Sequence, residues 1–287
     1  MINNEIEAVN GVKIPQVGFG VYKLSEGNHL ERVVEEAINV GYRHFDTAKI
    51  YGNEESLGST IQKSKIEREE FFITSKVWNT ELGYNATKKA FEQTCEKLKV
   101  EYLDMYLIHF AAPNYIEAWR AMEELYLENK IKVIGVANFE IQHLEQLIKN
   151  SRITPMINQI ETHPEFQQDE LHKYLIDNNI LHEAWAPLGQ GNKALLENNI
   201  IKNIADNHNK TIAQVILKWH IQRGVIIIPK SSNPKRIKEN FQLFDFELTS
   251  KEMDMIKQLN TGKRYSHSPT GYMINPLYNK LMKVFIK

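Results

Sequence analysis

The chain has 287 residues, with 35 lysines and arginines against 36 aspartates and glutamates and a formal net charge of −1. This balance argues against a nucleic-acid or anionic-membrane binder, and the length allows a large core without disulfides. The single cysteine, Cys95, excludes an internal disulfide, and no run approaches a membrane span or a signal peptide. We therefore expect a soluble, cytoplasmic protein in which nothing requires more than a monomer.

The first element is a predicted hairpin, because strand-like residues 7–9 and 12–14 flank the turn pair Asn10-Gly11. From residue 16 onward, strand-like runs alternate with helical patterns such as residues 30–38. The expected strands cover residues 16–20, 44–47, 71–77, 102–109, 132–138, 155–161, 181–187 and 225–230. Eight strands alternating with helices predict an α/β fold, one (β/α)8 TIM barrel over about residues 16–245, with the hairpin at its bottom.

Beyond the barrel, the sequence predicts a further helix and a tail over about residues 249–287. The helix start is marked by Thr249-x-x-Glu252, which is a capping box. Four apolar tail residues are expected to dock on the barrel wall as a helix: Leu277, Leu281, Val284 and Phe285. No linker interrupts the pattern, so we expect residues 1–287 to form a single domain.

Polar residues gather at the expected carboxyl ends of the strands, where such barrels place their catalytic groups. They are Asp46, Lys76, His109, Asn138, Gln159 and Trp185, with Tyr51 in the loop after the second strand. Just beyond Tyr51, Asn53 is the expected cap of a helix. Each polar residue alone has a structural explanation, such as a capped loop or a core histidine. An acid, a phenol, an ammonium and an imidazole on three consecutive strands favour a catalytic site.

These four groups suit the protonation of a carbonyl oxygen while a hydride reaches its carbon. An ammonium of Lys76 about 4 Å from the Tyr51 phenolate would stabilise it by ~4 kcal/mol at an effective dielectric of 20. This would bring the phenol's pKa from about 10 to near 7. Asp46 would keep Lys76 protonated, and His109 would orient the substrate oxygen. The choice of proton donor stays open between Tyr51 and His109, since imidazole has an unperturbed pKa closer to neutral pH.

The buried run 225–230 ends at a basic helix start, which suggests a phosphate site. Asn233 at the N-cap and Pro234 at the first helical position follow Lys230 and two serines. Barrels often bind phosphate at this place, although a solvated basic helix start is the alternative. Residues 189–194 match the weak pattern G-x-G-x-x-A, which we interpret as a flexible loop crossing a cofactor pyrophosphate. Trp185 offers a flat face for a nicotinamide, although packing at the barrel mouth is the plainer explanation.

Several segments together resemble the successive signatures of the aldo-keto reductase superfamily. They are GFGVY, GYRHFDTAKIYGNE, ITSKVW, YLDMYLIH, IGVANF, NQIETHP, AWAPLGQG and IPKSSNPKRIKENF, in order over about residues 5–260. The short loop after the seventh strand most resembles the bacterial branch of glyoxal and diketogluconate reductases. The resemblance implies NADPH-dependent reduction of small aldehydes and ketones, with Asp46, Tyr51, Lys76 and His109 as the catalytic tetrad.

The resemblance also implies the binding residues and no metal. The nicotinamide would be held by Asn138, Gln159 and Trp185, with Leu188 by the pyrophosphate. The adenosine 2′-phosphate end of NADPH would be held by Lys230, Ser231, Arg236, Glu239 and Asn240. The substrate pocket would be lined by Tyr22, Ile50, Trp78 and Phe110.

The chain departs from the family pattern at four places, one of which is His-Phe-Ala-Ala-Pro at residues 109–113, where His-Trp-Pro is frequent. Ala137 and Ala186 stand where serine is common, and the tail after about residue 262 does not match the usual ending. One of Tyr265, His267, Tyr272 or Met273 is expected to help close the substrate site. Two other functions stay open from the sequence: an NADPH-binding sensor or regulatory subunit, and a barrel glycosidase or Schiff-base aldolase. The second lacks a carboxylate pair, and a lysine paired with Asp46 would not be neutral.

Overall fold

The computed structural model describes residues 5–266 and 268–270. The expectations for the tail residues lie outside this part of the chain, except for the one on Tyr265. The chain begins with an antiparallel hairpin of β1 (Glu5–Glu7) and β2 (Lys13–Pro15). Asn10 Nδ2 donates to Lys132 O at 2.8 Å, which places the turn at the amino end of the barrel strands. This agrees with the predicted position of the hairpin.

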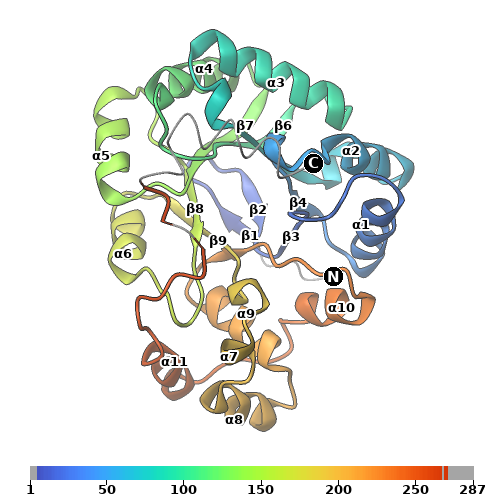
Figure 1. Cartoon of the computed structure of the whole chain (residues 1–287), viewed down its shortest axis with the longest axis vertical. Helices are drawn as coiled ribbons and strands as arrows, with labels where there is room; N and C mark the ends of the chain where they lie inside the picture. Colours follow the sequence, from blue (N-terminus) through green and yellow to red (C-terminus); the bar gives the residue numbers. More distant parts are fainter. Residues whose placement is uncertain (1–4, 267, 271–287) are drawn as a thin grey trace.

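Eight parallel strands follow, each paired with the next, and Figure 1 shows them at the centre of a ring of helices. They are β3 (Gly18–Gly20), β4 (His44–Asp46), β5 (Phe72–Val77), β6 (Leu103–Ile108), β7 (Ile131–Ala137), β8 (Ile157–Glu161), β9 (Leu181–Trp185) and β10 (Ile226–Ile227). A parallel bridge between Val17 and Ile227, with Ile227 N donating to Gln16 O at 2.9 Å, joins the last strand to the first. The predicted (β/α)8 barrel is confirmed.

The last strand is shorter than the expected run 225–230. Pro229 has no N–H to give to a strand ladder, and Gly20 N donates to Pro229 O at 3.2 Å. From there the chain leaves the sheet toward the next helix. The other seven expected strands match the observed ones to within about two residues at either end, which is the usual uncertainty of strand limits.

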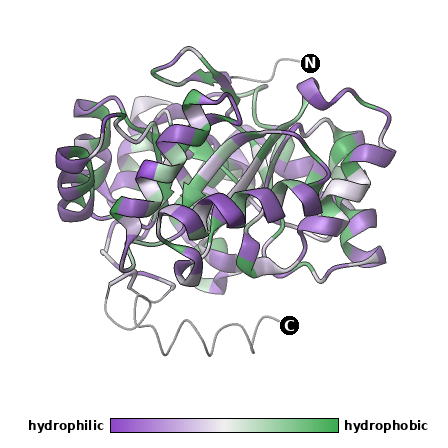
Figure 2. Cartoon of the chain, turned by 90° about the horizontal axis from the view of Figure 1, so that it is seen from above, coloured by the Kyte–Doolittle hydropathy of each residue, from purple (hydrophilic) through white to green (hydrophobic). Residues whose placement is uncertain are grey.

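The helices that cover the barrel are amphipathic, and Figure 2 shows hydrophilic outer faces around a hydrophobic interior. In α1 (Asn28–Val40), for example, Leu30, Val33, Val34, Ala37 and Ile38 are buried at helical spacing. The longer helices that follow are α2 (Glu54–Lys63), α3 (Tyr84–Leu98), α4 (Tyr115–Leu127), α5 (Ile141–Asn150), α6 (Asp169–Asp177), α8 (Asn199–His208), α9 (Ile212–Gln222), α10 (Pro234–Phe241) and α11 (Ser250–Lys257). The shorter ones are η1 (Lys49–Tyr51), η2 (Arg68–Glu70), η3 (Asn79–Glu81), η4 (Gly189–Gly191) and α7 (Lys193–Leu196).

The main core fills the barrel and the space beneath its helices, and a second cluster lies under α8, α9 and α11. The predicted capping box of α11 is present: Thr249 Oγ1 accepts from Glu252 N, and Glu252 Oε2 accepts from Thr249 N at 2.8 Å. Cys95 is buried in the main core, as expected. Among the described residues, no helix has the length and hydropathy needed to cross a membrane.

Candidate active site

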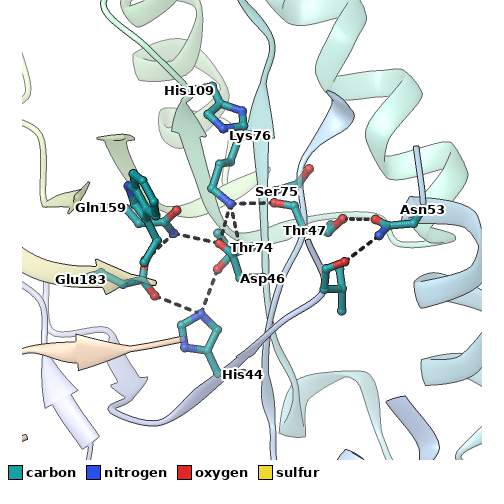
Figure 3. A network of polar contacts seen from close by, with 12 residues as sticks. His44, Asp46, Thr47, Asn53, Thr74, Ser75, Lys76, His109, Gln159 and Glu183 are labelled. Carbon is teal, nitrogen blue, oxygen red and sulfur yellow. Dashed lines mark hydrogen bonds and ion pairs between the residues drawn. The ribbon is translucent and has the colours of Figure 1, made fainter. Parts of the chain in front are cut away.

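The carboxyl ends of the strands form one edge of the barrel, here called the barrel mouth. Asp46 ends β4 and Lys76 lies one residue before the end of β5. The Lys76 ammonium is fully buried and donates to both Asp46 carboxylate oxygens, at 2.6 and 2.7 Å, and to Thr47 O at 3.0 Å (Figure 3). A buried ammonium keeps its charge only with such partners. The predicted pairing of Asp46 with Lys76 is therefore present.

The phenol and the imidazole lie beside this ion pair. Tyr51 ends η1, and its ring centroid is 5.2 Å from Lys76 Nζ. His109 directly follows β6, and its ring meets the Tyr51 ring edge-on with centroids 5.9 Å apart. The structure thus brings together all four residues of the expected tetrad.

The predicted fall of the Tyr51 pKa to near 7 is wrong for this structure. Burial raises the pKa of the phenol well above 10, and the negative charge of Asp46 adds to the rise. The reason is that the Lys76 ammonium is already neutralised by Asp46, so little of its charge acts on the phenol. Burial, together with the charge of Lys76, also lowers the pKa of His109 well below 6.5. His109 is neutral near pH 7, so Tyr51 is the better proton donor of the two.

Asn53 does not cap α2 as expected. Its side chain instead donates to Val21 O and Leu24 O, both at 3.0 Å, and accepts from the Thr47 hydroxyl at 2.8 Å. These bonds tie the loop after β3 to the loop after β4. Tyr22 lies in the first loop, and Tyr51 follows the second, so Asn53 fixes one side of the barrel mouth.

Below the mouth, an amide joins two carboxylates. Gln159 Nε2 donates to Asp46 Oδ2 at 2.9 Å and to Glu183 Oε2 at 2.8 Å. Both amide hydrogens are then used, and only the Gln159 carbonyl oxygen is left for a ligand. Glu183 Oε1 lies 3.6 Å from His44 Nε2 (Figure 3). Neither Glu183 nor His44 was among the residues predicted from the sequence.

A sequence signal for these two residues existed. Glu183 lies two residues before Trp185 and His44 two residues before Asp46, and both Trp185 and Asp46 were candidates near the carboxyl ends of their predicted strands. Because side chains alternate along a strand, a residue two positions before an inward-facing end also faces inward. A polar residue at that position needs a buried partner, so both residues belonged among the candidates.

The Trp185 side chain is positioned by Asn138, which is also predicted to hold the nicotinamide. Its indole N–H donates to Asn138 Oδ1 at 2.9 Å, and Asn138 Nδ2 donates to His109 O at 3.0 Å. Asn138 has a φ of 62°, in the left-handed region that asparagine tolerates better than most residues. The ring of Trp185 is half-buried, so one part of it remains open to a flat ligand.

The expected substrate-pocket residues surround the tetrad. Phe110 stacks on His109, with ring centroids 5.1 Å apart, and Trp78 meets His109 edge-on at 5.1 Å. The ring of Tyr22 is 5.0 Å from that of Tyr51, and Ile50 precedes Tyr51 in η1. Within the described part of the chain, His109 Nδ1 and Trp78 Nε1 are buried and have no hydrogen-bond partner.

The basic helix start also forms as predicted. Asn233 Oδ1 caps α10 by accepting from Arg236 N at 3.2 Å, and Ser231 Oγ accepts from Asn233 N at 3.1 Å. Lys230 and Arg236 are exposed. Partial desolvation of the Lys230 ammonium, together with the neighbouring charge of Lys23, lowers its pKa. Exposed cations at a capped helix N-terminus fit a phosphate group.

The remaining cofactor candidates lie nearby in α10 and in the loop after β9. Glu239 pairs with Lys235 at 3.7 Å, and Asn240 is buried in the same helix. Leu188 is half-buried just before η4. Tyr265 stacks on His163, with ring centroids 4.5 Å apart, and its ring lies against Gly189. The first tail residues therefore cover the glycine loop.

A closed barrel with a buried ion pair, a phenol and a basic helix start at one end has the parts of a barrel oxidoreductase. Comparison with known proteins agrees: residues 16–261 match the model described as "Aldo/keto reductase family". The chain belongs to the aldo/keto reductase family, as its motifs suggested.

Three relatives illustrate the similarity. Glyoxal reductase of Bacillus subtilis (strain 168) is 48% identical over 93% of this chain and 97% of its own length. Methylglyoxal reductase DkgA of Escherichia coli (strain K12) is 41% identical, also over 93% and 97%. The crystal structure of a Gox0644 mutant in complex with NADPH has a TM-score of 0.89 at 39% identity, covering 94% of this chain and 98% of that one.

Proposed function

We propose that this protein reduces small aldehydes and ketones, including glyoxals and keto-sugars, to alcohols, with NADPH as the cofactor and Tyr51 as the proton donor. The observation that supports this most directly is the tetrad at the barrel mouth, with Lys76 paired to Asp46 beside Tyr51 and His109. Relatives named as glyoxal and methylglyoxal reductases support the substrate class. The alternative of a regulatory NADPH-binding subunit finds no support among these relatives.

The residues at the mouth fit the proposed cofactor. When bound, NADPH supplies the hydride that adds to the carbonyl carbon. Trp185 offers its open ring to the nicotinamide, Gln159 offers its remaining carbonyl oxygen to the carboxamide N–H, and Asn138 has one amide hydrogen left. Leu188 would lie by the pyrophosphate. The 2′-phosphate end would be held by Lys230, Ser231, Arg236, Glu239 and Asn240.

In the proposed mechanism, Tyr51 holds its proton until negative charge develops on the carbonyl oxygen. Because burial raises its pKa, the phenol stays protonated across the physiological range. An alkoxide is a far stronger base than a phenolate, so the proton transfer remains downhill. The ion pair next to the ring, with Lys76 Nζ 5.2 Å from the ring centroid, holds the phenol in position for this transfer. His109, kept neutral by burial, orients the substrate oxygen through a ring N–H, and Trp78 and Phe110 exclude water.

Replacing Tyr51 with Phe tests the proton donor. We expect turnover of methylglyoxal to fall by about 10²–10⁴-fold, the usual contribution of a positioned general acid. NADPH binding, followed by quenching of tryptophan fluorescence, should change little. The matched control is Tyr84→Phe, which removes the hydroxyl of an exposed tyrosine on α3. Near-normal turnover by the Tyr51→Phe protein would refute the assignment.

We further propose that the protein works as a monomer in the cytoplasm. Its single cysteine is buried, and burial raises the pKa of the thiol to about 12, which suits a protein that forms no disulfide. Size-exclusion chromatography with light scattering tests the monomer directly, and a mass of twice the chain's 33.4 kDa would contradict it.

A further inference from the structure

Glu183 is a fully buried carboxyl group to which the proposed mechanism gives no role. It lies in β9, between β8 and β10, and its side chain faces the inside of the barrel below the tetrad. The strand β10 contributes the apolar Ile226 as its register partner. The polar and titratable groups that face it come from four other elements: His44 and Asp46 of β4, Lys76 of β5, Gln159 of β8 and Tyr51 of η1.

No cation is available to Glu183 among these groups. Lys76 directs its ammonium to both oxygens of Asp46 and to a backbone carbonyl. His44 Nδ1 lies 3.2 Å from Pro15 O, so this nitrogen carries the hydrogen. His44 Nε2 lies 3.1 Å from the Thr74 hydroxyl, which is the donor of this pair when the ring is neutral. Burial lowers the pKa of His44 to about 4, which agrees with this tautomer.

A charged Glu183 would therefore be a buried anion with one hydrogen bond. Its Oε2 accepts from Gln159, while its Oε1 has no hydrogen-bond partner within the described residues. An unpaired buried charge is far more costly than a buried neutral carboxyl group. Burial, with the added charge of Asp46, raises the pKa of Glu183 to about 8. Geometry and electrostatics agree that the proton stays on Glu183 at neutral pH.

We propose that Glu183 is a positioning residue that acts in its protonated form. The neutral carboxyl group accepts one hydrogen of the Gln159 amide while Asp46 accepts the other, so the amide cannot turn over. This fixes the Gln159 oxygen as the acceptor presented to a ligand. It also leaves Asp46 as the only anion beside Lys76, so that the ammonium and the phenol keep their arrangement.

Ionisation of Glu183 disturbs this arrangement at alkaline pH. The proton is released to solvent, and a second negative charge then acts on the same phenol, whose pKa it raises further. Tyr51 becomes a poorer acid, and Lys76 is drawn between two anions. The kinetic part of this inference rests on the proposed carbonyl reduction, and the protonation of Glu183 does not.

The protonation is tested first without turnover, by infrared titration of the full chain in D₂O. We expect a protonated-carboxyl band that disappears with a midpoint near pH 8, as the pKa of about 8 requires. The band should be missing in Glu183→Gln, an isosteric replacement that mimics the protonated acid. The control is Glu54→Gln: Glu54 is a second buried carboxyl group, bonded to Ser75 and Thr94, and its removal should leave the band in place. A band that is absent from the wild-type chain at pH 6.5 overturns the proposal, whether or not the variant folds.

The second test is the pH profile of methylglyoxal reduction. Wild-type kcat should fall by about tenfold per pH unit above the midpoint, because the fraction of chains in which Glu183 is protonated falls by that factor. Glu183→Gln should keep most of its neutral-pH rate and lose this alkaline fall, while Glu54→Gln retains it. A purely structural role predicts a lower rate at every pH with the fall unchanged, and that outcome overturns the positioning role. If wild-type enzyme shows no reduction at all, the proposed function fails, and the infrared titration still decides the state of Glu183.

Discussion

At the scale of single residues, the Lys76–Asp46 pair limits what the site tolerates. Both side chains are buried, and each is the other's main partner for charge. Burying two charges is costly, so such a pair adds little to stability overall, but removing one partner leaves the other charge uncompensated. The stability of the site therefore depends on whether the two residues are kept or removed together.

This dependence predicts non-additive stability. We expect Asp46→Asn to lower the free energy of unfolding by about 3–5 kcal/mol, the usual result of breaking a buried pair. The double variant Asp46→Asn with Lys76→Met should be less destabilised than Asp46→Asn alone, because no buried charge remains. Urea unfolding followed by circular dichroism measures both. Additive losses in the double variant would mean that Lys76 is not held mainly by Asp46.

Some properties of these individual residues were predictable from the sequence, and others were not. The positions of Asp46, Lys76 and His109 followed from where strands end, and Tyr51 from the loop after one of them. The direction of the Tyr51 pKa did not follow, because it depends on how deeply the ring is buried and on which group takes the charge of Lys76. Glu183 was missed because only residues at the predicted strand tips were taken as candidates, whereas it lies two residues before Trp185, and its partner Gln159 is distant in the sequence.

At the scale of elements, the start of α10 was the most predictable part of the site. Asn233 at the N-cap and Pro234 at the first position are local signals, and the helix begins where they place it. The position of residues 264–266, at the start of the tail, was unpredictable for the opposite reason, because long-range bonds to β8 hold them. Glu161 accepts from the N–H groups of Tyr265 and Ser266, at 2.7 and 3.1 Å, and pairs with Arg264 at 3.8 Å.

The exposed Arg236 predicts a preference between the two nicotinamide cofactors. Its guanidinium lies in the first turn of α10, where a 2′-phosphate could be bound bidentately. Loss of a charge-assisted hydrogen bond costs about 1.5–3 kcal/mol, so Arg236→Ala should weaken NADPH about 10–150-fold and NADH far less. Fluorescence titration with both cofactors measures this. The control is Lys238→Ala, an exposed cation on the same helix. Equal losses for NADPH and NADH would place the 2′-phosphate elsewhere.

At the scale of the whole molecule, the order and number of strands were predictable because strand-like runs alternate with helical patterns along the chain. The closure of the barrel was inferred from that number, and the bridge from Val17 to Ile227 confirms it. The end of β10 was predicted too late in the chain because the ladder is limited by pairing with neighbours, which periodicity does not encode. We propose that residues 1–287 fold as a single domain, as the uninterrupted pattern suggested.

The buried titratable groups predict how stability depends on pH. Burial lowers the pKa of six histidines: to about 4 for His44 and for His172, well below 6.5 for His109, His182 and His220, and below 6.5 for His143. His172 and His182 also face each other with their Nδ1 atoms 2.9 Å apart, a contact that admits one hydrogen. Below pH 6.5 the unfolded chain binds protons that the folded chain does not bind, so stability falls as the pH falls.

Glu183 has the opposite effect on the pH dependence of stability. Its folded pKa of about 8 lies above the ordinary value of 4.5, so the folded chain holds a proton that the unfolded chain releases. Stability from this group is complete below pH 4.5 and is lost as the pH rises toward 8. The six histidines outweigh it below pH 6.5, and above that pH they no longer titrate. Stability therefore rises with pH up to about 6.5 and falls above it, and we expect its maximum near pH 6.5.

Urea unfolding at about pH 5.5, 6.5, 7.5 and 8.5 locates this maximum, with each histidine contributing a slope of up to about 1.4 kcal/mol per pH unit on the acid side. His182→Gln should reduce the acid slope and leave the alkaline one unchanged. Glu183→Gln should flatten the alkaline slope and steepen the acid one, because glutamine has no proton to lose between pH 4.5 and 8. Stability that rises steadily from pH 6.5 to 8.5 would show that Glu183 is ionised in the folded chain. A wild-type chain equally stable at pH 5.5 and 6.5 would show that the buried histidines accept protons without unfolding.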